Sequence, residues 1–314
     1  MSSDTPIAFV LGTGRCGSTL VHEVIARHPD VGFVSNLEDR IAVGPPSLGR
    51  WNQTLYARVP ARFTQKGRLR FAPSEGYRVL GRQVSPMLVA PSRDLVTGDV
   101  TPWVDARLRR FFASRLHAQR TPMFLHKFTG WPRARFLHRV FPEARFVHVV
   151  RDGRGVASSF LQVPWWRGYD GPEAWGWGPL PSDAARRWED SDRSFAVLAG
   201  LQWKMLIDAA EAARAELPED RWLEIRYEEF VAAPRERMAE MLDFLKLRWT
   251  GAFERGFGSH TFTAGRTDAF RRDLGIHDVA MLDAALGDDL RRLGYVAPAG
   301  SAPSTDGAAE GGGG

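Results

Sequence analysis

The segment Pro6-Ile-Ala-Phe-Val-Leu-Gly-Thr-Gly-Arg-Cys-Gly-Ser-Thr-Leu20 decides the fold. The apolar run Ile7–Leu11 leads into a glycine-bearing turn and then into a helical pattern, an arrangement typical of a strand followed by a phosphate-binding loop. The loop has the frame G-x-x-x-x-G over Gly12–Gly17, and Ser18 stands where the P-loop of a nucleoside-triphosphate enzyme carries its lysine. The segment therefore predicts a phosphate site that lacks the usual lysine.

The rest of the chain alternates short apolar runs with helical patterns. Runs typical of buried strands are Ile7–Leu11, Met123–Phe128, Arg145–Val150 and Arg221–Arg226. Patterns typical of helices are Ser18–Arg27, Arg133–Val140, Gly155–Leu161, Asp183–Ala215 and Glu228–Leu245. This alternation predicts an α/β protein with a P-loop-like, three-layer α/β/α architecture around a mostly parallel sheet. Ligands of such sheets bind beyond the carboxyl ends of the strands, where the loop after Gly12 and Arg151 are expected.

One large domain accounts for most of the chain. We expect residues 1–296 to form it and residues 297–314 to be a disordered tail, because the tail has no apolar periodicity and ends in four glycines. Within the domain, residues 41–120 are interpreted as a variable region on the side of the second substrate. Residues 163–182 form a loop with four tryptophans, and long loops in compact domains are often lids.

Composition narrows the class of protein. The net charge of +5 and pI near 9.7 suit an enzyme with anionic substrates. The basic residues form no tract and no zinc-finger spacing occurs, so no nucleic-acid partner is predicted. No apolar run is long enough for a transmembrane segment, and the first residues lack the pattern of a signal peptide. A single cysteine favours a reducing, cytoplasmic location, and no spacing of metal ligands is present.

A second phosphate-like site follows the apolar run that ends at Val150. Arg151 leaves this strand at its carboxyl end, and Ser159 lies two turns into the next helix. An arginine and a hydroxyl that converge in this way suit a phosphate. A surface ion pair between Arg151 and Asp152 is the alternative. Two such sites on one sheet favour a nucleotide with two separated phosphate groups.

These two motifs, in this order, resemble those of sulfotransferases that use 3′-phosphoadenosine 5′-phosphosulfate (PAPS). The segment Gly12–Leu20 is similar to the family's 5′-phosphosulfate loop, and Arg151-Asp-Gly-Arg with Ser159 is similar to its 3′-phosphate motif. The stretch Phe141–Arg154 resembles the tyrosylprotein and bacterial small-molecule branches in particular. Ile225-Arg-Tyr-Glu-Glu-Phe is similar to the family's late strand–helix segment. The resemblance spans about residues 6–40 and 121–295, and it implies transfer of a sulfuryl group with release of 3′-phosphoadenosine 5′-phosphate (PAP).

The resemblance implies roles for particular residues in binding the donor. Arg15 and the backbone amides of Cys16, Gly17, Ser18 and Thr19 would hold the 5′-phosphate, and the Thr19 hydroxyl would also reach the sulfonate. Arg151 and Ser159 would hold the 3′-phosphate, and Tyr227 would lie near the adenosine unless it is only a core aromatic. A sulfuryl group carries less charge than a terminal phosphoryl group, so neither a P-loop lysine nor a metal is expected.

The resemblance also implies catalytic residues. Lys127, in an otherwise apolar strand, matches the family's transition-state cation, and Arg15 would assist it. Glu38 is the predicted general base, with Asp39 as the fallback; a helix-cap or ion-pair role for Glu38 is the alternative. Since neighbouring side chains of a strand point to opposite faces, His126 is expected to be packed rather than catalytic. Cys16 is interpreted as a small loop residue rather than a nucleophile.

The acceptor is left open. A hydroxyl, or an amine, of a small molecule, lipid or peptide would suit the chemistry, and the basic segment 50–82 and the tryptophan-rich loop could contribute to its site. Two other classes compete with a sulfotransferase. A P-loop kinase or NTPase would use Asp152 to hold Mg²⁺, and a non-catalytic nucleotide-binding protein would bind PAP without turnover.

Overall fold

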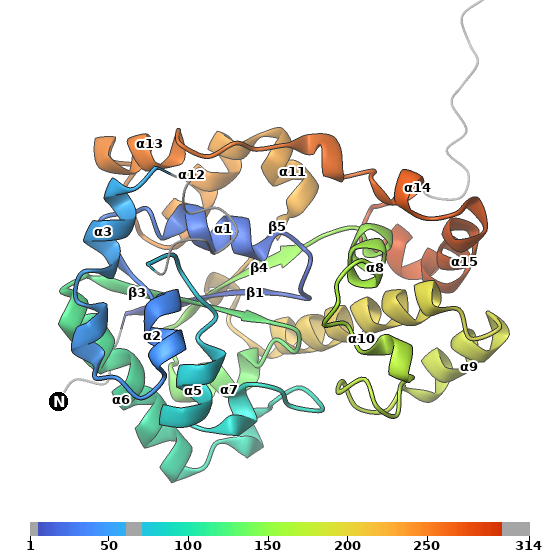
Figure 1. Cartoon of the computed structure of the whole chain (residues 1–314), viewed down its shortest axis with the longest axis horizontal. Coiled ribbons are helices and arrows are strands. Elements are labelled where there is room, and N and C mark those ends of the chain that lie inside the picture. Colours follow the sequence, from blue (N-terminus) through green and yellow to red (C-terminus); the bar gives the residue numbers. More distant parts are fainter. Residues whose placement is uncertain (1–5, 61–70, 297–314) are drawn as a thin grey trace, which may run out of the picture.

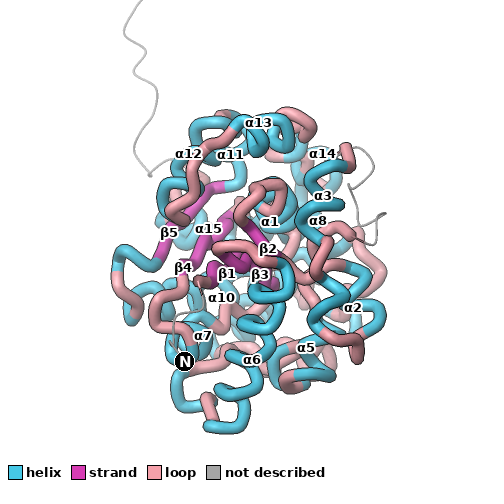
Figure 2. The backbone as a smooth tube through the Cα atoms, turned by 90° about the vertical axis from the view of Figure 1, so that its left-hand side faces the viewer, coloured by secondary structure: helices cyan, strands magenta, loops and turns pink. Residues whose placement is uncertain are grey.

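The computed structural model describes residues 6–60 and 71–296. Its centre is a sheet of five parallel strands in the order β2-β3-β1-β4-β5. Helices enclose this sheet on both faces (Figures 1 and 2). The predicted α/β class with three layers is therefore confirmed.

The elements have the following bounds. The strands are β1 Ile7–Gly12, β2 Val31–Gly32, β3 Met123–Thr129, β4 Arg145–Val150 and β5 Trp222–Arg226. The α-helices are α1 Ser18–Ile25, α2 Asn36–Ile41, α3 Asn52–Arg58, α5 Tyr77–Gln83, α6 Pro102–Gln119, α7 Ala134–Val140, α8 Gly153–Leu161, α9 Ser182–Asp190, α10 Phe195–Glu216, α11 Tyr227–Ala232, α12 Pro234–Phe244, α13 Gly251–Phe257, α14 Phe270–Asp273 and α15 Ile276–Arg292.

The central strands are buried on both faces, which is why they appear in the sequence as continuous apolar runs. In β1, Ala8 and Val10 belong to a core shared with α1, α8 and α12. Phe9 and Leu11 point the other way, into a core shared with α5, α6 and α7. Figure 1 shows α1, α11 and α12 above the sheet and α6 and α7 below it.

The topology places the phosphate loop at a crevice. From β1 the chain builds β2 and β3 on one side and later adds β4 and β5 on the other. Crossovers that diverge in this way leave a gap at the carboxyl ends of the strands, where such sheets bind ligands. The loop after β1 and the start of α8 after β4 both lie at this edge.

Two predicted helices are divided in the structure. The pattern over 183–215 breaks between α9 and α10, where Asp192 and Arg193 take φ angles of 53° and 58°. The pattern over 228–245 breaks at Ala233, because the residue before a proline avoids the helical region and Pro234 starts a new helix. The strand β2 was not predicted, since two residues give no periodic signal.

The variable region contains more regular structure than its sequence pattern indicated. Helices α2, α3, α5 and α6 lie wholly or partly within 41–120. The predicted tail 297–314 and part of the basic segment 50–82, including Arg62, Lys66, Arg68 and Arg70, lie outside the described residues. No helix among the described residues is long and apolar enough to cross a membrane.

Candidate active site

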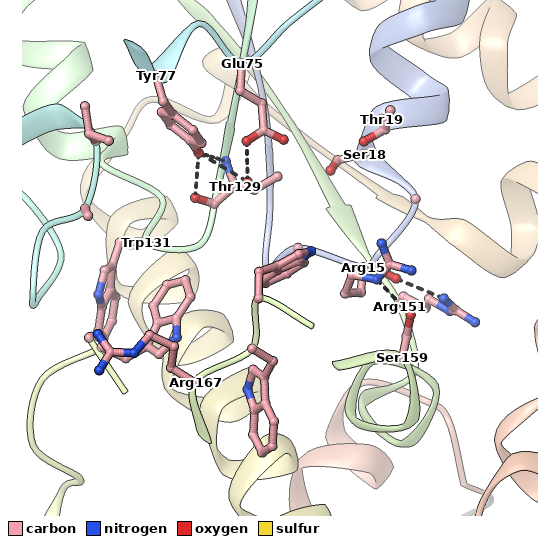
Figure 3. Close-up of a pocket in the computed structure, with 18 of the residues that line it drawn as sticks. Arg15, Ser18, Thr19, Glu75, Tyr77, Thr129, Trp131, Arg151, Ser159 and Arg167 are labelled. Carbon is pink, nitrogen blue, oxygen red and sulfur yellow. Dashed lines mark hydrogen bonds between the residues drawn. The ribbon is translucent and has the colours of Figure 1, made fainter. Parts of the chain in front are cut away.

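A cavity of about 830 Å³ opens at the carboxyl edge of the sheet. Its size is in the range of small-molecule sites. One end is formed by the phosphate loop with Arg151 and Ser159, and the other by the tryptophan-rich loop (Figure 3). The lining residues are Gly14, Arg15, Gly17, Ser18, Thr19, Leu20, Glu75, Tyr77, Val89, Ala90, Pro91, Thr129, Trp131, Arg133, Arg151, Ser159, Trp165, Trp166, Arg167, Trp175, Gly176, Trp177, Tyr227 and Arg266.

The phosphate loop has the backbone of an anion-binding turn. Gly14, Arg15 and Gly17 take φ angles of 82°, 56° and 92°, and such turns direct successive N–H groups toward one point ahead of a helix. Gly17 is required for a second reason. A Cβ atom there would lie 2.2 Å from the ring of Tyr227. The loop and the predicted adenosine-side tyrosine are therefore in direct contact.

Arg15, Arg151 and Ser159 are brought together as the two motifs predicted. The Arg15 Nε donates to Ser159 Oγ at 2.8 Å. Arg151 donates from one NH group to the Arg15 carbonyl oxygen at 2.9 Å and from the other to the Arg266 carbonyl oxygen at 2.7 Å. Its guanidinium carbon also lies 5.0 Å from the centre of the Tyr227 ring. Arg151 thus links the loop to a late segment of the chain, and Figure 3 shows it beside Arg15 and Ser159.

This end of the cavity carries positive charge without a matching acid. Arg15, Arg151 and Arg266 all line it, and within the described residues none of them is paired with a carboxylate. Burial, together with the charges of Arg151 and Arg266, lowers the pKa of Arg15. Cations that are held close together in a partly buried place raise the free energy of the folded state unless an anion binds between them. The arrangement is therefore that of an anion site.

Lys127, on β3 with only 3% of its surface exposed, does not itself line the cavity but contacts two residues that do. Its Nζ donates to Thr19 Oγ1 at 2.7 Å and forms an ion pair with Glu75 Oε1 at the same distance. The predicted catalytic lysine is thus in contact with the first turn of α1, and its acidic partner comes from the segment just before α5.

Glu75 reaches the cavity from this segment and is held by polar neighbours. Its Oε2 accepts from Thr129 Oγ1 at 3.0 Å, and the Tyr77 hydroxyl donates to the Thr129 carbonyl oxygen at 3.1 Å. Burial by itself would raise the pKa of Glu75, but Lys127 and these hydrogen bonds outweigh it and lower the pKa below its ordinary value of 4.5. Glu75 is therefore an ionised carboxylate facing the cavity (Figure 3).

Glu38 does not reach the cavity, and this position corrects its assignment as the general base. Its side chain forms the capping box of α2 with Ser35. Its Oε1 pairs with Arg115 Nε at 3.1 Å, and both side chains are almost fully buried. Asn52 donates to the other oxygen. Asp39 is also occupied elsewhere, because it accepts from the first backbone N–H groups of α5. The helix-cap alternative thus describes Glu38.

Other predicted residues take structural positions. Cys16 is fully buried under the loop and does not line the cavity. His126 is fully buried on the opposite face of β3, where it packs against Phe112 and Phe128 and burial lowers its pKa to about 3. Asp152 caps α8 and accepts from Arg154 at 2.7 Å, so it does not occupy the place of a Mg²⁺-holding aspartate.

The far end of the cavity is aromatic. Trp131 follows β3, and Trp175 and Trp177 come from the tryptophan-rich loop. The ring of Trp177 rests on the backbone of Gly130, where a Cβ atom would lie 2.6 Å from the ring. Trp166 is fixed by a hydrogen bond from its indole N–H to Gln202 Oε1 at 2.8 Å. The loop over 163–182 therefore forms a wall of the cavity.

The sequence did not reveal three residues of the site. Glu75 lies in the weakly patterned region, where it is the single acid of the basic segment 50–82. Tyr77, two residues further on, has no motif of its own. Arg266 occurs in a short 3₁₀ turn far from both phosphate motifs. An acid surrounded by bases was the one available signal.

Comparison with known proteins identifies the family of this chain. A family model described as "Sulfotransferase family" matches residues 6–251, and the chain belongs to this family. No curated protein sequence matches significantly. Sulfotransferase STF1 from Mycobacterium tuberculosis H37Rv is similar in structure, with a TM-score of 0.55 and 17% identity over 91% of this chain and 77% of that one. STF9 from Mycobacterium avium has a TM-score of 0.54 and 14% identity over 93% and 77%.

A third similar structure is the sulfotransferase domain from the curacin biosynthetic pathway, with a TM-score of 0.52 and 14% identity over 91% of this chain and 99% of that one. At this level of identity the structures support the shared fold. The family assignment defines the chemistry: the protein is an enzyme that transfers the sulfuryl group of PAPS.

Proposed function

We propose that this sulfotransferase transfers the sulfuryl group of PAPS to an acceptor hydroxyl by in-line displacement, with Glu75 as the general base. The observation that carries the proposal is the contact of Lys127 Nζ with both Thr19 and Glu75. This contact joins the phosphate loop, a buried cation and a carboxylate that lines the cavity. Donor, leaving group and acceptor would therefore converge on one lysine.

The cationic end of the cavity suits the donor nucleotide. PAPS carries phosphate groups on both sides of its ribose, and the end formed by Arg15, Arg151 and Arg266 offers guanidinium groups that lack an acidic partner among the described residues. Arginine binds phosphate through paired N–H groups. We assign the 5′-phosphate to the loop with Arg15, and the 3′-phosphate to Arg151, Ser159 and Arg266. Tyr227, packed on Gly17, would adjoin the adenosine.

Sulfuryl transfer requires a positive charge that stabilises the negative charge developing on the leaving group. As the acceptor oxygen bonds to sulfur, the bond between sulfur and the 5′-phosphate oxygen breaks, and negative charge grows on that oxygen. A preorganised cation in a site that excludes water stabilises such charge strongly. Lys127, which contacts Thr19, and Arg15, which belongs to the loop, can supply this cation. Thr19, which shares Lys127, would orient the sulfonate.

The acceptor must lose its proton as the new bond forms. Glu75 is ionised and lines the cavity next to Lys127, so its carboxylate can accept the proton directly. General-base catalysis of this kind contributes roughly 10²–10⁴-fold to the rate. When Lys127 turns toward the leaving-group oxygen, its pairing with Glu75 weakens and the carboxylate becomes more basic. The same lysine thus couples leaving-group stabilisation to proton removal.

Incubation of the purified enzyme with ³⁵S-labelled PAPS and a fractionated cell extract tests the proposal. We expect label to appear in a compound with a free hydroxyl, and mass spectrometry to locate the sulfate on that oxygen. The matched control is Lys127→Ala, which should bind PAP but transfer no label. Label that appears on nitrogen only, or at equal rates with both proteins, would contradict the proposal.

A further inference from the structure

The acceptor end of the cavity differs from the donor end in charge. Among its described lining residues the cations are Arg133 and Arg167, and both are engaged. Arg133 is buried and donates to the carbonyl oxygens of Thr129, Trp131 and Val89. Arg167 is exposed and pairs with Asp170 at 3.0 Å. Glu75 adds a negative charge. The Glu75 charge is itself paired with Lys127, and both guanidinium groups already have oxygen partners, so a carboxylate or phosphate on the acceptor would find no unengaged cation among these lining residues.

Most polar groups at this end are bonded to one another. Tyr77, Thr129 and Glu75 form a closed set of hydrogen bonds. The indole N–H of Trp175 donates to the Gly178 carbonyl oxygen at 2.7 Å. That of Trp131 is buried and has no hydrogen-bond partner among the described residues. Few donors and acceptors are left for the many hydroxyls of a sugar, and buried hydroxyls without partners are costly.

The remaining surface is flat and apolar. Trp131 and Trp175 belong to one hydrophobic cluster with Leu198, Met205 and Leu206 behind them, which fixes their rings. Trp177 rests on Gly130, and Val89 and Pro91 also line this end. Rigid aromatic walls favour a ring that stacks on them. They also remove the water that would otherwise compete with the acceptor hydroxyl for the sulfuryl group.

We infer that the acceptor is an uncharged, largely apolar alcohol with a flat ring system, as in a phenol, and that it carries no acidic group. This inference rests on the proposed function, since it takes the aromatic end as the acceptor site. The ring lies among Trp131, Trp175 and Trp177, and its single hydroxyl points to Glu75. Acidic peptides and charged or neutral sugars are excluded by the lack of an unengaged cation and by the shortage of free polar groups.

Matched acceptors test this inference. The panel consists of 2-naphthol, methyl 6-hydroxy-2-naphthoate as a neutral analogue of larger size, 6-hydroxy-2-naphthoate as its anionic counterpart, and N-acetylglucosamine. We measure kcat/KM for transfer from labelled PAPS, and calorimetric binding of each acceptor to the PAP complex. The neutral naphthols should bind and react, with the carboxylate about tenfold poorer or worse than its methyl ester, because its charge would lie against the apolar wall without a partner.

A designed change of charge provides the matched protein test. Ala90 is exposed and lines the cavity, so Ala90→Arg adds a cation at the acceptor end without disturbing the core. It should raise kcat/KM for the carboxylate relative to its ester by about tenfold. Val43→Arg adds the same charge at an exposed position outside this cavity and should leave the ratio unchanged.

The outcomes separate this inference from the proposed function. If PAP does not bind, the proposed function fails. If PAP binds and PAPS is consumed, but the carboxylate or the sugar is the better acceptor, only the inference about the acceptor fails. A PAP complex that binds none of the naphthols overturns the inference as well. Equal ratios for Ala90→Arg and Val43→Arg would show that the ring does not lie against this wall.

Discussion

Replacement of Glu75 by glutamine separates the general base from its structural neighbours. Glutamine keeps the shape of the side chain and an oxygen for the Thr129 hydroxyl, but it cannot accept a proton. Loss of a general base reduces the rate by about 10²–10⁴-fold, which corresponds to roughly 3–5 kcal/mol in the activation free energy. We therefore expect Glu75→Gln to lower kcat by this factor and to leave PAP affinity within a few-fold of the wild type.

The matched control is Glu38→Gln. Glu38 and Arg115 are both almost fully buried, and removal of one partner of such a pair costs about 3–5 kcal/mol in the free energy of unfolding. At roughly 2 °C per kcal/mol for a large domain, Tm should fall by about 6–10 °C. Below that temperature kcat should stay close to the wild-type value. If Glu75→Gln keeps full turnover while Glu38→Gln loses it, the assignment of the base is wrong.

The pH dependence adds a second test of the same residue. A general base must be ionised, so activity is present above its pKa and is lost as the pH falls through it. The pKa of Glu75 in the free enzyme is lowered below 4.5, and kcat/KM, which reports the free enzyme, should therefore be level down to this region. Burial raises the pKa of Glu23, a carboxyl on α1, to about 7. An acidic limb centred near pH 7 would point to Glu23 instead.

Further substitutions test the cations and the loop. Lys127→Ala should lower kcat far more than PAP affinity, as stopped-flow turnover and calorimetry would show; equal effects on both would assign it to binding alone. Arg266→Ala should weaken PAP binding by about 10–100-fold, since a hydrogen bond to a charged group contributes roughly 1.5–3 kcal/mol, whereas the exposed Arg193→Ala should have no effect in the same titration. Gly17→Ala should abolish PAP binding in a thermal-shift assay, because its Cβ atom would meet the Tyr227 ring and its φ angle is 92°; retained binding would show that the loop can rearrange.

Local sequence patterns predicted the layers of the fold and the cationic end of the site. The two strands that lead into the phosphate motifs appear as apolar runs, one followed by Gly12 and the other by Arg151. These two residues were therefore placed correctly at the edge of the sheet. The short segment around Glu38 fits both a helix-capping role and the proposed catalytic role, so the sequence alone could not choose between them. Only the burial of Glu38 against Arg115 in the folded chain separates the two roles.

Contacts between residues far apart in the chain could not be predicted from the sequence. Glu75 reaches Lys127 across 52 positions of the chain because α5 packs beside the end of β3, and no spacing rule encodes that approach. Arg266 joins the phosphate arginines through a carbonyl contact with Arg151, which likewise depends on how the late helices close over α8. Such partners become visible only when the chain is folded.

A crystal structure of the enzyme with PAP tests the account of the site most directly. We predict the 5′-phosphate in the loop formed by residues 13–19, the 3′-phosphate between Arg151, Ser159 and Arg266, and Lys127 directed toward the 5′-phosphate oxygen that leaves during transfer. The acceptor end next to Glu75 and Trp177 should stay open. A nucleotide bound in the aromatic end, or phosphates that contact none of these arginines, would contradict the account.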